Sequence, residues 1–265
     1  MSTSFEEHLA KGISLAEAGN HEAAAEVFSH CTDLEPNSPE GFFYLGEALT
    51  GSGKLPEAVA AYEKGLALAP EDCDALLSLG DIYFERGDHK EALKLYRKVS
   101  DLDPHNADAF VSIGLVHANQ ERAEDAIAAY QTALGIDPEN VFAYNALGDA
   151  WYGLGEREKA IAAFQKGIEL DPEDAAAHFN LGELYYDLEE FEQAEKECLE
   201  SVRLDPEFTL SYLTLGSLCM DEERVGDAIR YLELYLRYET SPQAAEMVTE
   251  VRAVLDGLKA EAAGS

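Results

Sequence analysis

Four carboxylates recur in one register of the sequence, each with aromatic residues a few positions away. Glu47 and Asp81 are 34 residues apart, and so are Asp149 and Glu183. The aromatic residues near them are Phe43, Tyr44, Phe84, Phe142, Tyr152, Phe179 and Tyr186. A carboxylate can pair with a cationic side chain, and an aromatic face can hold the same cation by a cation–π contact. The combination therefore suits a basic, partly apolar peptide.

The sequence shows none of the motifs that mark common enzyme sites. It contains no GxSxG, no HExxH, no phosphate-binding glycine loop and no calcium-loop spacing of carboxylates. We therefore predict that the chain is not an enzyme and that it uses no cofactor.

The cysteines lie far apart and form no CxxC pair. They are Cys31, Cys73, Cys198 and Cys219. This spacing argues against a disulfide framework and against a zinc site. We interpret them as reduced packing residues and predict no metal site.

The chain is strongly acidic, with 53 acidic and 19 basic residues and a formal charge of −34. Such a charge repels phosphate backbones and anionic lipid headgroups, so we expect no nucleic acid partner and favour a cationic protein segment. An alternative is that the acidity serves solubility alone, as in salt-loving organisms.

The sequence also bears on location. No run of about 18 apolar residues is present, which predicts no membrane insertion. The N-terminus, MSTSFEEHLAKG, lacks the basic start and apolar stretch of a secretory signal. We therefore expect a cytoplasmic protein.

A series of prolines shows how these residues are organised. Its members, each 34 residues after the last, are Pro36, Pro70, Pro104, Pro138, Pro172 and Pro206. A fixed period of this length is typical of a repeat array. We therefore predict one quasi-linear array rather than separate globular domains.

The repeats have definite boundaries when position 1 is counted from Phe5. Residues 1–4 are N-terminal cap residues, and seven repeats fill residues 5–242 as 5–38, 39–72, 73–106, 107–140, 141–174, 175–208 and 209–242. Each repeat is predicted to form two helices, over positions 1 to 14 and about 18 to 31. An apolar stripe at spacings of three and four predicts a capping helix over residues 243–259, and we expect a disordered tail over 260–265.

Several positions mark the ends and the contact of these helices. Residues typical of a helix N-cap recur as Ser38, Asp72, Asn106, Asn140 and Asp174. Position 8 is always Gly and position 20 is always Ala, which predicts a close approach of the paired helices. Position 15 is a helix-ending Gly in four repeats, whereas Glu121, Glu189 and Glu223 predict strained or differently built turns.

The combined pattern resembles the tetratricopeptide repeat family. In the fifth repeat the matching residues are Tyr144, Leu147, Gly148, Trp151, Ala160, Phe164, Gly167 and Pro172. The resemblance implies an all-α, right-handed superhelical α-solenoid of seven helix pairs plus a C-terminal capping helix. It also places His8, His117, His178 and Trp151 at core positions, so we interpret them as packing residues.

The resemblance further implies that positions 2, 5, 6, 9, 12 and 13 line a concave groove. These positions hold Glu6, Glu17, Glu40, Glu47, Asp74, Asp81, Glu85, Asp108, Asp149, Glu183, Asp187 and Asp221, and no Lys or Arg. The candidate partner-binding residues are Phe43, Tyr44, Glu47, Asp81, Phe84, Phe142, Asn145, Asp149, Tyr152, Phe179, Asn180, Glu183 and Tyr186. An Asn side chain can bind a peptide backbone as donor and acceptor at once. Packing between adjacent first helices is the alternative explanation of each aromatic residue.

These observations predict a non-catalytic scaffold that binds a partner peptide or helix, basic and partly apolar, in an acidic aromatic groove. One alternative is a self-assembling scaffold, a homo-oligomer formed through the array ends or the groove. Another is the repeat arm of an enzyme whose catalytic part is absent from this chain.

Overall fold

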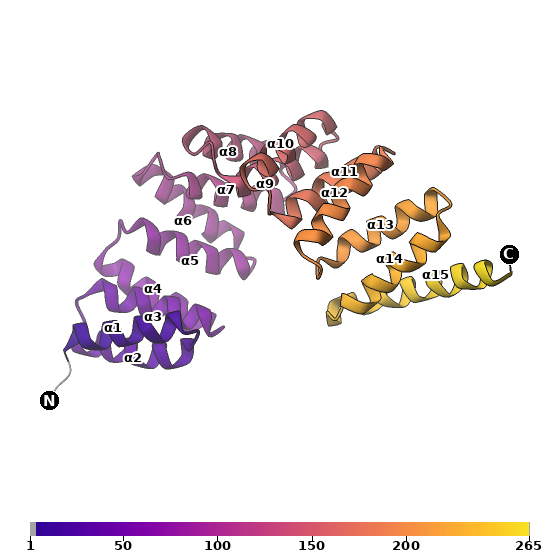
Figure 1. Ribbon diagram of the computed structural model, residues 1–265. Helices are drawn as coiled ribbons and strands as arrows, with labels where there is room; N and C mark the ends of the chain where they lie inside the picture. The colour runs from indigo at the N-terminus through magenta and orange to yellow at the C-terminus, as the bar shows by residue number, and fades with distance from the viewer. Residues whose placement is uncertain (1–3, 265) are drawn as a thin grey trace. The chain divides into compact units, whose positions relative to one another are not determined.

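The computed structural model describes residues 4–264, and every regular element between these residues is helical. The first eight helices are α1 (Phe5–Glu17), α2 (His21–Leu34), α3 (Pro39–Gly51), α4 (Leu55–Leu68), α5 (Cys73–Glu85), α6 (His89–Leu102), α7 (Ala107–Asn119) and α8 (Ala123–Ile136). They are followed by α9 (Val141–Gly153), α10 (Arg157–Leu170), α11 (Ala175–Asp187), α12 (Phe191–Leu204), α13 (Thr209–Asp221), α14 (Val225–Tyr238), the 3₁₀ turn η1 (Pro242–Ala244) and α15 (Ala245–Gly264). Figure 1 shows them as successive pairs.

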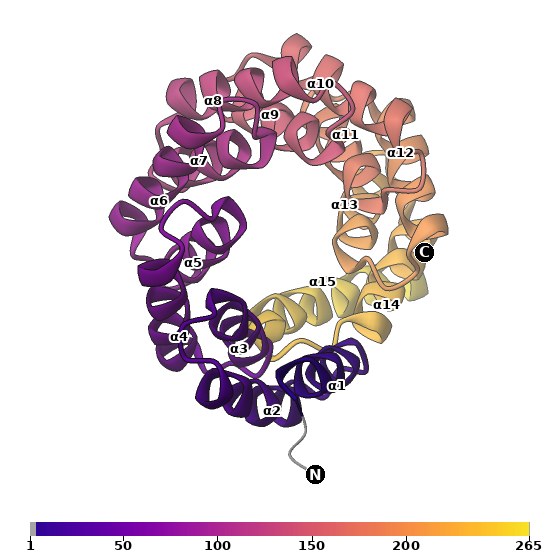
Figure 2. The ribbon, with the colours of Figure 1, turned by 90° about the vertical axis from the view of Figure 1, so that its left-hand side faces the viewer.

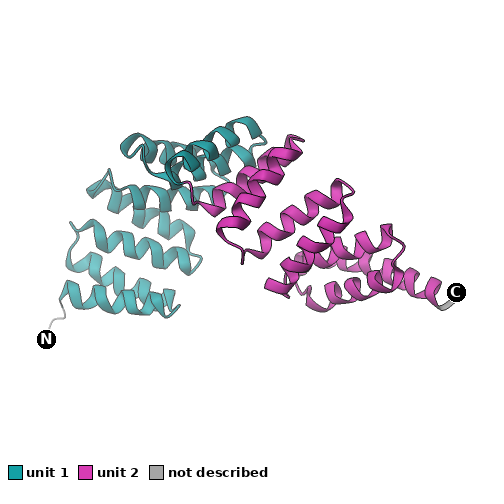
Figure 3. Cartoon of the chain, turned by 45° about the horizontal axis from the view of Figure 1, so that its top comes forward, with its two compact units in different colours: residues 1–137 teal, residues 138–265 magenta. Residues whose placement is uncertain are grey.

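The chain divides into two compact units, residues 1–137 and residues 138–265 (Figure 3). Unit 1 contains α1 to α8, and unit 2 contains α9 to α15. In both units each helix packs against the next one in the sequence. The predicted all-helical repeat fold is therefore confirmed.

The first helices of neighbouring repeats also touch each other. In unit 1, α1 contacts α3, α3 contacts α5, and α5 contacts α7, whereas the second helices make no such contact among the described residues. Figure 2 shows α3, α5 and α7 on the inner side of unit 1, with α4, α6 and α8 outside them. In unit 2, α11 likewise contacts α9 and α13. The first helices therefore provide the inner face of each unit.

Helix starts follow the predicted caps with one exception. The side chains of Asp72, Asn106, Asn140 and Asp174 accept backbone N–H bonds at the start of the following helix, at 2.8 to 3.2 Å. Ser38, which precedes Pro39, makes no such bond.

The repeated glycine at position 8 leaves room for the side chain at position 24 of the same repeat, which is an aromatic ring in the first five repeats and Cys198 or Leu232 in the last two. A Cβ built on Gly148 would lie 2.5 Å from the ring of Phe164, and Gly80 faces Tyr96 in the same way. Phe164 is 1% exposed, so burial of this ring offsets the cost of about 1 kcal/mol for a helical glycine. The predicted close approach is confirmed.

The three glutamate turns have the same backbone conformation as the glycine turns. Glu121, Glu189 and Glu223 have φ of 58°, 60° and 59°, and Gly87 has φ of 78°. A side chain in this left-handed region is strained. The prediction of strain is confirmed, and the alternative of a differently built turn is wrong.

The C-terminal helix packs through one stripe of side chains. Val251 and Leu255 of α15 are buried in a cluster with Tyr231 and Tyr235 of α14. The helix continues through residues 260–264, where the sequence predicts a disordered tail. The alanines and Glu261 in this stretch favour helix, which is consistent with its continuation. Residues 1–3 and 265 of the predicted terminal segments lie outside the described residues.

No helix within residues 4–264 combines the length and the apolar character needed to cross a bilayer.

Candidate functional site

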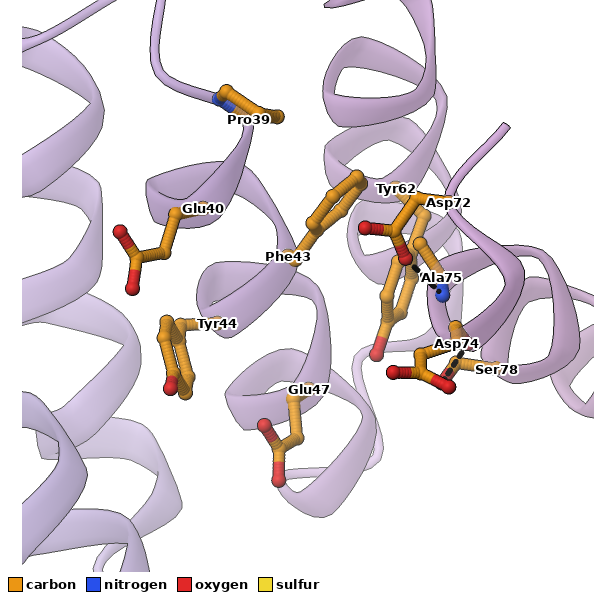
Figure 4. A pocket seen from close by; sticks show the side chains of 10 residues that line it. All are labelled: Pro39, Glu40, Phe43, Tyr44, Glu47, Tyr62, Asp72, Asp74, Ala75 and Ser78. Atoms are coloured by element: carbon orange, nitrogen blue, oxygen red, sulfur yellow. Dashed lines mark hydrogen bonds between the residues drawn. The ribbon is translucent and has the colours of Figure 1, made fainter. Parts of the chain in front are cut away.

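One hollow on the inner face of unit 1 lies between α3 and α5, and we call it the α3–α5 pocket. It has a volume of about 550 Å³. Its lining residues are Pro39, Glu40, Phe43, Tyr44, Glu47, Tyr62, Asp72, Asp74, Ala75 and Ser78 (Figure 4). Most of them occupy the repeat positions that the family resemblance assigns to a groove.

The charges of this pocket are all negative. Glu40, Glu47 and Asp74 are exposed, and their carboxylates make no hydrogen bond or ion pair with other described residues. Asp72 is engaged, because it accepts the Ala75 N–H at 2.9 Å. No residue of the lining is Lys or Arg. The pocket therefore has an uncompensated negative potential.

The aromatic residues of the pocket pack against neighbouring rings and also line the pocket. The ring of Phe43 stacks on Tyr62 at 6.4 Å between centroids, and the ring of Tyr44 stacks on Phe28 at 5.3 Å. Phe43 and Tyr44 are half-buried, so each keeps an open surface. Their rings form fixed apolar walls beside the carboxylates (Figure 4).

Two smaller pockets adjoin this one. The first, of about 360 Å³, is lined by His21, Glu47, Thr50, Gly51, Tyr62, Ser78, Asp81, Ile82 and Glu85. The second, of about 280 Å³, is lined by Ile13, Ala16, Glu17, His21, Phe28, Tyr44, Glu47 and Ala48. Glu47 contributes to all three pockets, so the hollow continues along α1, α3 and α5.

Asp81 and Phe84 contact residues of α6 in their own repeat. The Tyr96 hydroxyl donates to Asp81 at 2.7 Å. Partial removal from water raises the pKa of the Asp81 carboxyl, and the Tyr96 bond opposes this change. The ring of Phe84 packs against His89 at 5.5 Å. These two candidates contribute to structure as well as to the inner face.

In unit 2 tyrosines link neighbouring first helices. The Tyr152 hydroxyl of α9 donates to Asp187 of α11, and the Tyr186 hydroxyl of α11 donates to Asp221 of α13 at 2.7 Å. The Asp187 bond is the main reason why the pKa of Tyr152 rises to about 12. Burial and the Asp221 bond raise the pKa of Tyr186 to about 12. Both bonds join position 12 of one repeat to position 13 of the next.

Asp149 and Glu183 stand close to each other on the same face. The Asn180 side chain donates to Asp149 at 3.4 Å. Asp149 lies at the surface, but surrounding protein atoms remove enough water to raise the pKa of its carboxyl to about 6, and the Glu183 charge adds to the rise. Burial, followed by the charge of Asp187, raises the pKa of Glu183.

The remaining candidates in unit 2 differ in exposure. Asn145 donates to Asp174 at 2.8 Å, while its oxygen is buried against Gly167. Phe179 is 8% exposed and packs on Phe208 at 5.2 Å, whereas Phe142 is 55% exposed. Asn145 and Phe179 therefore serve the packing of the repeats, and Phe142 stays open.

The sequence placed Glu40 and Asp74 among the predicted groove acids, but neither they nor Tyr62 were among the candidate partner-binding residues. Tyr62 occupies a core position, and the other two are acids near a helix start, where the helix dipole explains them as well. The exact 34-residue spacing of Glu40 and Asp74, with aromatic residues three and four positions after Glu40, was the signal available.

Histidine packing has an additional feature that the sequence did not indicate. His117 and His178 are buried, as predicted, whereas His8 is half-buried. His178 also lies 2.7 Å from Glu197 of α12. No group of His, Cys, Asp and Glu within residues 4–264 has the arrangement of a metal site.

Sequence comparison finds one kind of repeat along the chain. A family model described as tetratricopeptide repeat matches residues 9–72, 45–106 and 77–141. Two related models, a TPR repeat and a tetratricopeptide repeat, match residues 148–189 and 175–208. Comparison with curated protein sequences gives no match.

Solved structures with this arrangement of helices are similar in fold. A tetratricopeptide repeat protein from Parabacteroides merdae is 17% identical, with a TM-score of 0.72 over 96% of this chain and 98% of that one. Cut9–Hcn1 of the APC/C is 18% identical, with a TM-score of 0.72 over 91% of this chain and 48% of that one. MamA from Desulfovibrio magneticus RS-1 is 26% identical, with a TM-score of 0.59 over 64% of this chain and 96% of that one.

Proposed function

The chain belongs to the tetratricopeptide repeat family, and on this premise we propose that it is a non-catalytic scaffold that binds a cationic, partly apolar segment of another protein. The α3–α5 pocket is the observation that carries this proposal. It combines three carboxylates that have no partner among the described residues with two open aromatic walls.

Physical chemistry favours this occupant over a neutral or acidic one. Like charges that face one hollow repel each other, and a bound cation relieves the repulsion. The aromatic walls bury the apolar part of a lysine or arginine side chain and contact its charge. A cytoplasmic location is part of the proposal, since the four cysteines are free thiols, as a reducing compartment keeps them.

The test uses the full chain and fluorescein-labelled peptides of equal length. One peptide alternates basic and apolar residues, a second has the same apolar residues with Glu in place of each base, and a third alternates bases with Gly and Ser. Fluorescence anisotropy gives the dissociation constants. We expect the first peptide to bind best and the second not at all.

Salt dependence and one pair of variants complete the test. Affinity should fall on going from low salt to about 1 M salt, where the screening length is about 3 Å. Glu47→Lys should weaken binding, whereas Asp101→Lys, the same charge change on an exposed residue of α6, should have only a small effect. The proposal fails if no basic peptide binds, or if salt and Glu47→Lys leave the affinity unchanged.

A further inference from the structure

Two consecutive repeats of unit 1 use the same pair of positions differently. In the third repeat, buried Tyr96 donates to Asp81. In the second repeat the corresponding residues are Tyr62 and Glu47, and they form no hydrogen bond. Tyr62 is 5% exposed, with the Ser78 hydroxyl beside its own. Glu47 is thus left without a described partner in a pocket whose lining also contains the buried Tyr62.

The free carboxylates reach this pocket from two helices. Glu40 and Glu47 come from α3, one on either side of Tyr44, and Asp74 comes from the first turn of α5 (Figure 4). The ring of Phe43 lies between the two helices (Figure 4). A ligand in the pocket therefore meets acceptors from more than one direction and a flat apolar surface.

We infer that the α3–α5 pocket holds an arginine side chain of the bound segment, an assignment that rests on the proposed function. A guanidinium is planar and carries five N–H donors, so it can donate to acceptors on different sides while its face lies on an aromatic ring. A lysine ammonium is a compact, strongly hydrated charge and stacks less well on a flat aromatic ring. The geometry of separated carboxylates around rings therefore selects arginine.

On the described inner face of unit 2, three carboxylates are already engaged, whereas Glu183 has no described donor. Asp149, Asp187 and Asp221 already accept hydrogen bonds from Asn180, Tyr152 and Tyr186. A cation that bound there would compete with these donors. In unit 1, by contrast, Glu40, Glu47 and Asp74 have no described donor, whereas Asp72 and Asp81 do.

The test compares three forms of the basic, apolar peptide with the full chain: one with a central Arg, one with Lys, and one with citrulline, which keeps the planar shape but has no charge. We expect the Lys peptide to bind about tenfold more weakly than the Arg peptide, equivalent to about 1.4 kcal/mol, and the citrulline peptide more weakly still.

Variants then locate the site. Glu47→Gln and Asp74→Asn should each lower the affinity for the Arg peptide and reduce the difference in affinity between the Arg and Lys peptides. Asp221→Asn in unit 2 is the matched control, and it should leave both affinities unchanged. Circular dichroism and thermal unfolding check that each variant is folded. We expect them to fold, because the replaced side chains are exposed.

The possible results separate the two proposals. If no basic peptide binds, the proposed function itself fails. If basic peptides bind but Arg and Lys are equal, or if Asp221→Asn weakens binding while Glu47→Gln does not, the function stands and the arginine site in unit 1 is overturned.

Discussion

The Nδ1 atom of His178 lies 2.7 Å from Oε2 of Glu197, in a buried contact between α11 and α12. Lys196 adds a second contact to Glu197 at 2.6 Å. At the same repeat positions, the second repeat has Phe42 and Ala61. One repeat thus has a titratable pair where another has apolar residues.

This pair makes the stability of unit 2 depend on pH. The Glu197 bond raises the pKa of His178 above its ordinary 6.5, so the pair's contribution is full below that value and is lost as pH rises through the folded-state pKa. The pKa of Glu197 is lowered, so its contribution is present above the ordinary 4.5 and is lost in stronger acid. Urea unfolding of the wild type and of the apolar double variant His178→Phe, Glu197→Ala measures this. The wild type should lose stability relative to the variant as pH rises above 6.5, the ordinary pKa of histidine. An unchanged difference would contradict the assignment.

His117 predicts the opposite dependence in unit 1. Its Nδ1 is buried without a partner, and burial, with help from Arg122, lowers its pKa. The folded state therefore resists protonation, and stability falls as pH drops below the ordinary 6.5. His117→Leu, which copies Leu49 at the same repeat position, should remove this acid sensitivity. Denaturant unfolding at about pH 5 and about pH 7.5 tests it, and an equal pH effect in both proteins would refute it.

Replacing the glutamate with glycine in each of the three glutamate turns should increase the stability of the protein. Glu121→Gly, Glu189→Gly and Glu223→Gly each remove left-handed strain, and after the extra entropy of the unfolded chain is subtracted each should stabilise by about 0.5 to 1 kcal/mol. Chemical denaturation of single and triple variants gives the values. Gly87→Ala, the reverse change at φ of 78°, is the control and should destabilise.

Adding a methyl group at Gly148 should destabilise the fold. Its Cβ would meet the Phe164 ring at 2.5 Å, so Gly148→Ala should lower the free energy of unfolding by about 1 to 3 kcal/mol. Gly153→Ala is the control in the same helix, because nothing lies within 4 Å of a Cβ there. The control should be neutral or stabilising, and equal losses at both sites would rule out the ring contact as the cause.

The tyrosine links of unit 2 should stabilise the stack without binding the ligand. Tyr186→Phe removes the bond to Asp221 and should cost about 1 kcal/mol of stability. A double-mutant cycle with Asp221→Asn isolates the coupling energy. If Tyr186→Phe weakens the Arg peptide as strongly as Glu47→Gln does, the tyrosine belongs to the binding site instead.

The helices, turns and most caps could be predicted because they depend on residues close in sequence. Asn140 needs only the next three residues to act as a cap, and Glu121 occupies the place of a turn glycine. Ser38 was the failure among the caps, since the preference of a residue type for the cap position does not decide whether its side chain forms the bond.

The candidate site was harder to predict because its details depend on contacts between repeats. Asn145 and Phe179 have the right repeat positions for a groove, but Asp174 and Phe208 engage them. Tyr152 and Asp187 are 35 residues apart, and their bond exists only when two first helices lie side by side. Periodicity indicates which side of a helix a residue occupies, whereas a partner on the next repeat decides whether it is available.

The unequal engagement of carboxylates has an evolutionary consequence. Replacement of Glu40 or Asp74 breaks no described hydrogen bond, so single mutations there can alter ligand preference while the repeats stay packed. Tyr152 and Asp187 must change together if their bond is to be replaced. New binding specificities are therefore more easily reached by mutation in the N-terminal half of this protein, while the C-terminal half is held to its present sequence by its own internal pairs.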